Sequence, residues 1–571
     1  MKRFTAFLLA TLLTFAAVTA AAAAESGAKP VGTDSGSLGD YIYWSLTYDG
    51  FLTISGSGAM PDNEAPWDSY SVRNIEFDGS VTHIGAGAFS DCNFLESVYL
   101  PETLESIGNS AFSGCWSLES VYLPDTLETI GNSAFSGCSS LTEATLPDDL
   151  TSLGSEAFSG CTALQTINLP DGITVLPDGV FGDCQSLTQI DIPDQVTAIG
   201  AGALLSCIGL TEVTLPDDLT SLGSEAFSGC TALQTINLPD GITVLPDGVF
   251  SDCQSLTQID IPDQVTGIGS SAFYNCEALT GVIIPDSVLA IGENAFLSCG
   301  GLTSVTFGSN LQSIGSSAFM YCGRLQSVAI PNSVITIGNN AFEYCASIES
   351  LTIGNHVQSI GVYAFGYCAE FTHLTIPESV TYIGNNAFWA CQKMESVVIN
   401  AAVTYIPGGA FDSCTRLSSI TFPEGVTSIG SYAFYDCHAL TDIVIPDTVQ
   451  SIGDNAFGYC LYLKSVTIPP SVTTIHNNAL YYTPQDLVIY APDGSPAQTF
   501  AQNKGIAVRL MGDFDGNSIV DVADITVLLR CLAEFEELTD AQTTAADFNY
   551  DGKVNVLDVT DMQRYLAELE A

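Results

Sequence analysis

A short unit of alternating apolar and polar residues recurs along most of the chain. One copy begins Leu302-Thr303-Ser304-Val305-Thr306-Phe307 and continues through Leu311, Ile314-Gly315, Ala318-Phe319 and Cys322. The alternation in its opening residues predicts a short strand whose apolar side chains point inward. In most copies a proline such as Pro285 follows the strand and ends it, because proline donates no ladder hydrogen bond. The Ile-Gly step requires a small or conformationally permissive residue where the chain turns.

Cysteine marks the period of this unit. Successive cysteines stand 23 residues apart, at positions 92, 115, 138, 161, 184, 207, 230, 253, 276, 299, 322, 345, 368, 391, 414, 437 and 460. A single unit of this length cannot bury its own apolar side chains, so the units must stack on one another. We therefore predict a β-rich solenoid of about 17 stacked units over residues 80–485.

One block of three units occurs twice. Residues 141–200 and 210–269 are nearly identical and differ only at the pairs Ala144/Val213, Gly182/Ser251 and Ala198/Gly267. The blocks are offset by 69 residues, which is three periods of 23. A stack in which each unit touches only its neighbours tolerates the insertion of a whole block.

The segments on either side of the repeat predict caps. Before it, alternating apolar residues around Asp49-Gly50 predict a hairpin within residues 25–79. After it, the unit containing Leu480 lacks the cysteine, and apolar segments at 487–490 and 505–508 predict a closing cap over residues 486–510. Terminal units must cover the apolar edges of the stack, so a departure from the repeat pattern is expected there.

The units resemble the BspA-like, or Treponema-type, leucine-rich repeats of bacterial surface proteins. The resemblance covers about 80–490 and is seen in Leu440, Pro446, Ile452-Gly453, Ala456-Phe457 and Cys460. It implies a leucine-rich-repeat solenoid that serves as a secreted or surface recognition scaffold and has no catalytic activity of its own.

The first residues have the order of a secretory signal peptide. Lys2 and Arg3 precede an apolar run over residues 4–18, and a string of alanines ends at Ala24. The apolar run is shorter than the roughly 20 residues that span a bilayer. We therefore predict a signal peptide at 1–24, a secreted or extracellular protein, and no membrane insertion.

The charge of the chain is strongly negative. Its 13 Lys and Arg residues against 64 Asp and Glu residues give a net charge of −51. Such a surface repels phosphate backbones and anionic headgroups, so nucleic acid and membrane surfaces are not expected partners.

The cysteine column predicts a buried ladder of thiols. Neighbouring thiols in register lie near the ~4.8 Å strand spacing, whereas the Cβ atoms of a disulfide lie about 3.8 Å apart. Cysteine also packs well as a small buried apolar residue. Disulfides and a metal site remain alternatives, although the chain has no C-x-x-C pair.

Two acidic segments near the C-terminus align with an offset of 34 residues, from Asp513 to Asp547. In each, oxygen-bearing side chains stand at loop positions 1, 3, 5, 9 and 12, and a backbone carbonyl is available at position 7. This order surrounds one Ca²⁺ with oxygen ligands. The predicted ligands of two calcium ions are Asp513, Asp515, Asn517, Ile519, Asp521 and Asp524 in the first loop, and Asp547, Asn549, Asp551, Lys553, Asn555 and Asp558 in the second. Amphipathic helices are predicted at 525–534 and 559–568.

Residues 511–571 resemble a type I dockerin, because each of two loops ends in Asp and leads into one helix. The resemblance implies a small all-α module that docks, in a Ca²⁺-dependent way, onto a cohesin module of a cellulosome-type scaffoldin. Familiar dockerins carry Ser or Thr at two positions that help to choose the cohesin. Those positions here are Val522, Ala523, Val556 and Leu557.

Two further residues of this segment are singled out. Arg530 and Arg564 occupy equivalent places and are candidates for the charged part of the cohesin interface, although solvated helix faces would explain them equally well. Cys531 lies in the first predicted helix and is predicted to be a core residue.

The sequence contains no group of residues at the spacings that are typical of a catalytic site. The five histidines lie in different repeats, and none pairs with Cys or a carboxylate at a metal or triad spacing. Tyr274, Trp389 and Tyr435 share a column, too sparsely for a continuous aromatic platform. We therefore predict a non-catalytic recognition or adhesion protein whose solenoid binds a protein or a cell-wall polysaccharide. The alternatives are a structural spacer and an accessory role in polysaccharide degradation.

Overall fold

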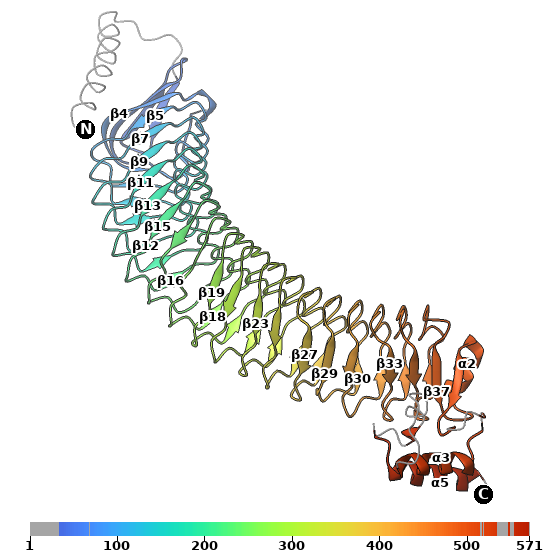
Figure 1. The fold of residues 1–571 in the computed structure, drawn as a ribbon. Helices are drawn as coiled ribbons and strands as arrows, with labels where there is room; N and C mark the ends of the chain where they lie inside the picture. Colours follow the sequence, from blue (N-terminus) through green and yellow to red (C-terminus); the bar gives the residue numbers. More distant parts are fainter. Residues whose placement is uncertain are drawn as a thin grey trace, which may run out of the picture. The chain divides into compact units, whose positions relative to one another are not determined.

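The computed structural model describes residues 34–67, 69–513, 517, 519–533, 546–548 and 553–569. The predicted signal peptide lies outside these residues. The chain divides into two compact units, Met1–Gly172 and Ile173–Ala571. Figure 1 shows that the repeats in each unit form flat coils stacked one on the next, so the β-rich solenoid predicted from the sequence is confirmed.

The first unit opens with a sheet of longer strands. These are β1 (Asp34–Leu38), β2 (Ile42–Leu46), β3 (Phe51–Ala59) and β4 (Asn74–Ile84), with a short 3-10 helix, η1 (Ser69–Ser71), between the last two. β2 and β3 pair antiparallel with Trp44 opposite Ile54, and β3 then pairs parallel with β4. The hairpin therefore leads directly into the parallel stacking of the coils.

Each coil of the first unit contributes two very short strands. One series is β5 (Ser97–Tyr99), β7 (Ser120–Tyr122), β9 (Glu143–Thr145) and β11 (Thr166–Asn168), and the other is β6 (Ser106–Ile107), β8 (Thr129–Ile130) and β10 (Ser152–Leu153). Each strand pairs parallel with the equivalent strand one coil away, as Ser97 does with Ser120.

The second unit continues the same two series. The first comprises β13 (Gln189–Asp191), β15 (Glu212–Thr214), β17 (Thr235–Ile236), β19 (Gly281–Ile283), β21 (Ser304–Thr306), β23 (Ser327–Ala329), β25 (Ser350–Thr352), β27 (His373–Ile376), β29 (Ser396–Ile399), β31 (Ser419–Thr421), β33 (Asp442–Val444), β35 (Ser465–Thr467), β37 (Val488–Ala491) and β38 (Ala507–Leu510). The second comprises β12 (Val175–Leu176), β14 (Ala198–Ile199), β16 (Ser221–Leu222), β18 (Gly267–Ile268), β20 (Ala290–Ile291), β22 (Ser313–Ile314), β24 (Thr336–Ile337), β26 (Ser359–Ile360), β28 (Tyr382–Ile383), β30 (Tyr405–Ile406), β32 (Ser428–Ile429), β34 (Ser451–Ile452) and β36 (Thr474–Ile475).

Helices occur only near the C-terminal end of the described residues of this unit. They are α2 (Pro496–Lys504), between β37 and β38, and α3 (Val522–Leu532) and α5 (Val556–Leu569) beyond β38. Ser495 caps α2 by accepting a hydrogen bond from the Gln498 backbone N–H, and Gly505 ends it at φ 69°. None of the described helices is long and apolar enough to cross a membrane.

The second strand of each coil was not predicted from the sequence. It covers only two residues, such as Ser313–Ile314, which pair with Thr336 and Ile337 of the next coil. Two residues are too few to produce a visible alternation of apolar and polar positions. The sequence therefore shows only the first series of strands.

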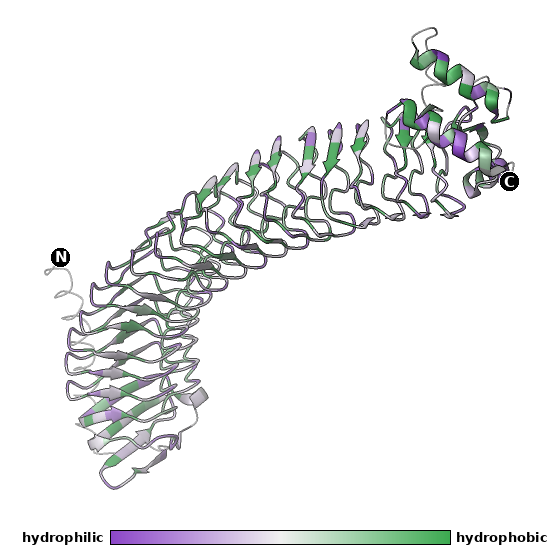
Figure 2. Ribbon diagram, turned by 90° about the horizontal axis from the view of Figure 1, so that it is seen from below, coloured by the Kyte–Doolittle hydropathy of each residue, from purple (hydrophilic) through white to green (hydrophobic). Residues whose placement is uncertain are grey.

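Columns of identical apolar side chains fill the interior of the coils. In the second unit Phe319, Phe342 and Phe365 stack with ring centroids 5.2 and 5.3 Å apart and planes within 2° of parallel. Green apolar and purple polar residues alternate along the coils in Figure 2. Because each ring is covered by the ring of the next coil, the stacking itself supplies the core.

The ladder cysteines lie beside these rings and are completely buried. Most of these thiols donate a hydrogen bond to the carbonyl of the residue 26 positions earlier, as Cys253 does to Phe227 at 3.2 Å and Cys230 does to Leu204 at 3.3 Å. Burial raises the pKa of Cys138, Cys207 and Cys460 to about 12. These thiols are therefore protonated donors at neutral pH, and their carbonyl partners belong to the preceding coil.

We predict that the ladder thiols resist alkylation until the protein unfolds. The thiolate is the reactive species, and burial with a raised pKa leaves little of it. Mass spectrometry should find nearly all 18 cysteines alkylated after denaturation. In the native protein, half-buried Cys531 should react well before any ladder cysteine. Recovery of most ladder cysteines as disulfides would contradict this prediction.

The glycine that follows the second strand is needed for space. A Cβ added to Gly223 would lie 2.3 Å from the Ala201 backbone nitrogen of the preceding coil. Its φ lies outside the left-handed region, so conformational freedom is not what the position requires. The backbones of neighbouring coils approach so closely here that only glycine, which has no Cβ atom, fits between them.

Gly223→Ala should therefore destabilise the solenoid by about 1–3 kcal/mol, because the added methyl group overlaps backbone atoms. Gly267→Ala is the matched control, since a Cβ at Gly267 meets nothing within 4 Å and the duplicated block has Ala198 there. Thermal unfolding followed by circular dichroism should show a lowered Tm for the first variant and an unchanged or slightly raised Tm for the second. Equal effects of the two substitutions would disprove the spatial explanation.

Candidate functional site

The two C-terminal helices begin three residues earlier than the sequence pattern predicts. Asp521 caps α3, with its Oδ1 accepting a hydrogen bond from the Ala523 backbone N–H at 2.7 Å. Asp524 Oδ2 in turn accepts one from the Asp521 N–H at 2.9 Å. This reciprocal capping box brings the last predicted loop positions into the first turn of the helix.

The second helix begins with the same arrangement. Asn555 Oδ1 accepts a hydrogen bond from the Leu557 N–H at 2.8 Å, and Asp558 Oδ2 accepts one from the Asn555 N–H at 2.7 Å. Asp524 and Asp558, the last predicted ligands of their loops, are completely buried. The 34-residue sequence repeat is therefore also a repeat of local geometry.

Side-chain oxygens also organise the first loop. Asp513 Oδ1 accepts a hydrogen bond from the Asn517 N–H at 3.1 Å. Asn517 Oδ1 then accepts one from the Ile519 N–H at 2.7 Å. These bonds link Asp513, Asn517 and Ile519 within the loop.

The donor chemistry fits a hard cation such as Ca²⁺, because every predicted ligand contributes oxygen. Of these ligands, Asp515, Asn549 and Asp551 lie outside the described residues. The part of the chain that the structure describes holds no group of three His, Cys, Asp or Glu residues that could bind a metal by itself. Asp524 and Asp558 stand at the start of each helix, where the capping hydrogen bonds fix the position of the last oxygen ligand predicted for each loop.

All six predicted partner-binding residues are exposed. Val522, Val556 and Leu557 are apolar yet 68, 64 and 58% exposed on the first turns of their helices. Ala523 and Arg530 are also exposed, and so is Arg564, whose Nη1 donates a hydrogen bond to Asp561 Oδ1 at 3.0 Å. Each helix thus presents an apolar N-terminal turn and an arginine.

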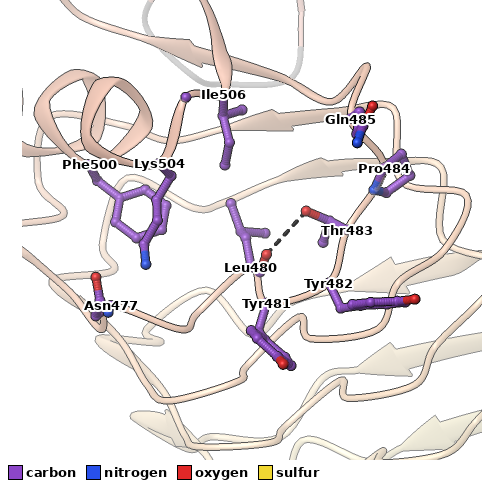
Figure 3. A pocket seen from close by; sticks show the side chains of 11 residues that line it. Asn477, Leu480, Tyr481, Tyr482, Thr483, Pro484, Gln485, Phe500, Lys504 and Ile506 are labelled. Carbon is purple, nitrogen blue, oxygen red and sulfur yellow. Dashed lines mark hydrogen bonds between the residues drawn. The ribbon is translucent and has the colours of Figure 1, made fainter.

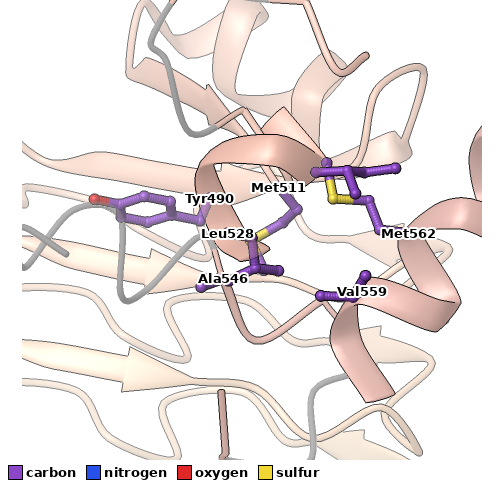
Figure 4. Packing of buried hydrophobic residues seen from close by; sticks show 7 residues of the cluster. Tyr490, Met511, Leu528, Ala546, Val559 and Met562 are labelled. Carbon is purple, nitrogen blue, oxygen red and sulfur yellow. The ribbon is translucent and has the colours of Figure 1, made fainter. Parts of the chain in front are cut away.

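The helices share a small core with the last coils of the solenoid. Met511, Leu528, Val559 and Met562 pack around Ala546, and Tyr490 of β37 belongs to the same buried cluster (Figure 4). Tyr490 is only 5% exposed. Cys531 is not part of this cluster and is half buried, so the prediction that it lies in the core is wrong. Cys531 lies in the last turn of α3 and is partly exposed.

Histidines have carboxylate partners that the sequence spacing did not reveal. His438 Nε2 lies 2.7 Å from Asp436 Oδ1, and His476 Nδ1 lies 2.8 Å from Asp454 Oδ1. The second pair joins neighbouring coils, so stacking creates it. The side chains of both pairs are partly exposed.

The fold and the paired loops define a leucine-rich-repeat solenoid with a C-terminal loop-helix module. The model of the BspA type leucine rich repeat region matches residues 63–188, 175–303, 289–408 and 381–494. The model of the dockerin type I domain matches residues 511–567. The chain belongs to the BspA-type leucine-rich repeat family and ends in a type I dockerin domain.

Solved structures of bacterial leucine-rich repeat proteins are similar to the chain. One, from Bacteroides ovatus, is 23% identical, with 79% of this chain and 98% of that chain covered and a TM-score of 0.39. A leucine rich cell surface protein from Faecalibacterium prausnitzii is 27% identical, with 68% and 94% covered and a TM-score of 0.36. No curated protein matches the chain.

Proposed function

We propose that this chain is a secreted, non-catalytic recognition protein. Its dockerin attaches it to a cohesin module of a cellulosome-type scaffoldin, while its solenoid binds a partner. The duplicated helix start carries this proposal: two helices with the same capped start each present an exposed apolar first turn, followed along the helix by an exposed arginine. The domain boundaries proposed for this role are a signal peptide at 1–24, an N-terminal linker and capping hairpin at 25–79, repeats at 80–485, a C-terminal cap at 486–510 and the dockerin at 511–571.

Docking depends on two calcium ions in this proposal. The first loop holds one ion through Asp513, Asp515, Asn517, Asp521, Asp524 and the Ile519 carbonyl. The second holds the other through Asp547, Asn549, Asp551, Asn555, Asp558 and the Lys553 carbonyl. A bound cation neutralises the acidic loop and ties it to the N-terminus of the following helix. Asp521 and Asn555 would then link the loops to α3 and α5, since each caps its helix.

Removal of calcium should therefore unfold the dockerin and abolish cohesin binding. We expect EDTA, or Asp513→Ala combined with Asp547→Ala, to lower the helical circular dichroism of 511–571 and to prevent binding to a panel of type I cohesins, measured by surface plasmon resonance. Added Ca²⁺ should restore binding after EDTA treatment but not in the double variant. Cohesin binding that survives either change would refute the calcium-dependent docking.

The repeated geometry further predicts that either helix can face the cohesin. Arg530→Glu or Arg564→Glu alone should then change the affinity little, because the other face remains available. The double variant should lose about tenfold or more, since charged interface pairs contribute on that scale. Arg416→Glu, on a solenoid coil, is the control. If one single variant already abolishes binding, only one face docks.

A further inference from the structure

A run of tyrosines lies along the turns of the last coils, where the sequence suggested only scattered aromatic residues. Tyr432 contacts Tyr435, and Tyr435 contacts Tyr459 of the next coil, with ring centroids 5.3 Å apart in both cases. Tyr459 then stacks on Tyr482 at 4.7 Å with an interplanar angle of 22°. The run is hard to see in the sequence because its members occupy different positions of the turn: Tyr432 and Tyr435 stand five and two residues before Cys437, whereas Tyr459 stands one residue before Cys460.

Tyr459 and Tyr482 have a backbone conformation that tyrosine rarely adopts. Tyr459 and Tyr482 both have a φ of 57°, in the left-handed region. The same position one residue before the ladder cysteine is held by Gly137 and Gly160 in earlier coils, at φ values of 74° and 73°. A bulky side chain is uncommon there because its Cβ crowds the backbone. Asp252, Asn275 and Ser298 hold the same position in other coils at φ values of 58°, 58° and 63°, so the turn accepts varied side chains there, tyrosine among them.

The tyrosine run ends in a pocket of about 540 Å³ (Figure 3). Tyr481 and Tyr482 form one side of it and remain 51 and 63% exposed. Because Tyr459 covers one face of the Tyr482 ring, this exposure leaves the opposite face accessible. Leu480, Phe500 and Ile506 provide apolar surface around the pocket.

The polar side chains that line the pocket include amides and an ammonium group but no carboxylate. Asn477, Gln485 and Lys504 contribute two amides and one ammonium group. None of the eleven lining residues is Asp or Glu, in a chain that contains 64 of them. The pocket is therefore a local exception to the acidic surface, and it suits a neutral or anionic ligand rather than a cationic one.

We infer that this pocket, with the tyrosine run that leads to it, binds a carbohydrate chain built of pyranose units. A pyranose ring has an apolar C–H face that packs on an aromatic ring and a rim of hydroxyl groups that require hydrogen-bond partners. Tyr481 and Tyr482 offer the aromatic surface, and Asn477, Gln485 and Lys504 offer the partners.

The shape of the site favours a sugar over a protein surface. Its volume lies within the range of small-molecule pockets, and its lining combines polar groups with apolar side chains. The tyrosine run continues the same chemistry across the coils before it, as a linear polymer would require. This inference deepens the recognition role proposed for the solenoid and does not depend on the dockerin.

Isothermal titration calorimetry of the full chain with cellohexaose, xylohexaose, mannohexaose and hexagalacturonate tests the site. We expect at least one of these to bind, and Tyr481→Ala and Tyr482→Gly each to weaken that binding about tenfold or more. Tyr482→Gly should keep the fold, since glycine accepts the left-handed φ, and Gln485→Ala provides a second variant on an exposed polar side chain. If hexagalacturonate is the ligand, Lys504→Met should weaken its binding; a neutral hexasaccharide should be insensitive to that change.

Tyr99→Ala combined with Tyr122→Ala is the matched control, because these residues are 61 and 51% exposed on adjacent coils of the first unit. Circular dichroism and cohesin binding should be unchanged in all of the variants, which separates failure of this site from failure of the docking proposal. The inference is overturned if none of the four hexasaccharides binds, if the pocket variants bind as well as the control, or if only a protein is recognised through these tyrosines.

Discussion

Contact between each coil and the next holds this protein together. A single coil has two strands of two to four residues and no partner within itself for their backbone groups. Parallel pairing to the equivalent residues 23 positions away supplies those partners, and the same translation places phenylalanine on phenylalanine and cysteine on the carbonyl of the preceding coil. The spacing of 23 residues is therefore a physical requirement, because a shift of one residue would misplace every one of these contacts together.

The same requirement separates positions that must stay constant from positions that are free to change. Gly223 cannot accept a side chain, because the backbone of the preceding coil occupies the space. The turn before each cysteine points away from the core and holds Gly137 in one coil and Tyr459 in another, with nearly the same backbone conformation in the left-handed region. A surface site can therefore be built by substitution in one turn column without disturbing the stack. Equivalent side chains then lie about one coil spacing apart, which turns single tyrosines into a continuous run.

This separation explains what could be predicted from the sequence. The stacking and burial of the repeating units follow from the 23-residue period, because apolar residues recur at the core positions. The cysteines predict about 17 units, whereas the solenoid has about 20 turns, because the parallel pairing continues into the caps. The two-residue strands such as Ser313–Ile314 were missed, since they leave no periodic trace. Helix α2 (Pro496–Lys504) lies within the C-terminal cap, and the repeat pattern does not predict it. The tyrosine run and the His476–Asp454 pair were missed for another reason: both join neighbouring coils, and their partners become neighbours only through stacking.

The dockerin is organised differently, because the hydrogen bonds that start its helices join residues that are close together in the sequence. Asp521 and Asp524 organise the start of α3 within four residues, and Asn555 and Asp558 do the same for α5. The sequence therefore predicted the loops but placed the helix starts three residues too late. An Asp that caps a helix and an Asp that ends a loop cannot be told apart in the sequence. The solenoid draws its stability from apolar stacking, whereas the proposed calcium ions would hold the acidic side chains of the loops together. Under the proposed function, calcium would therefore control attachment while the coils stay folded.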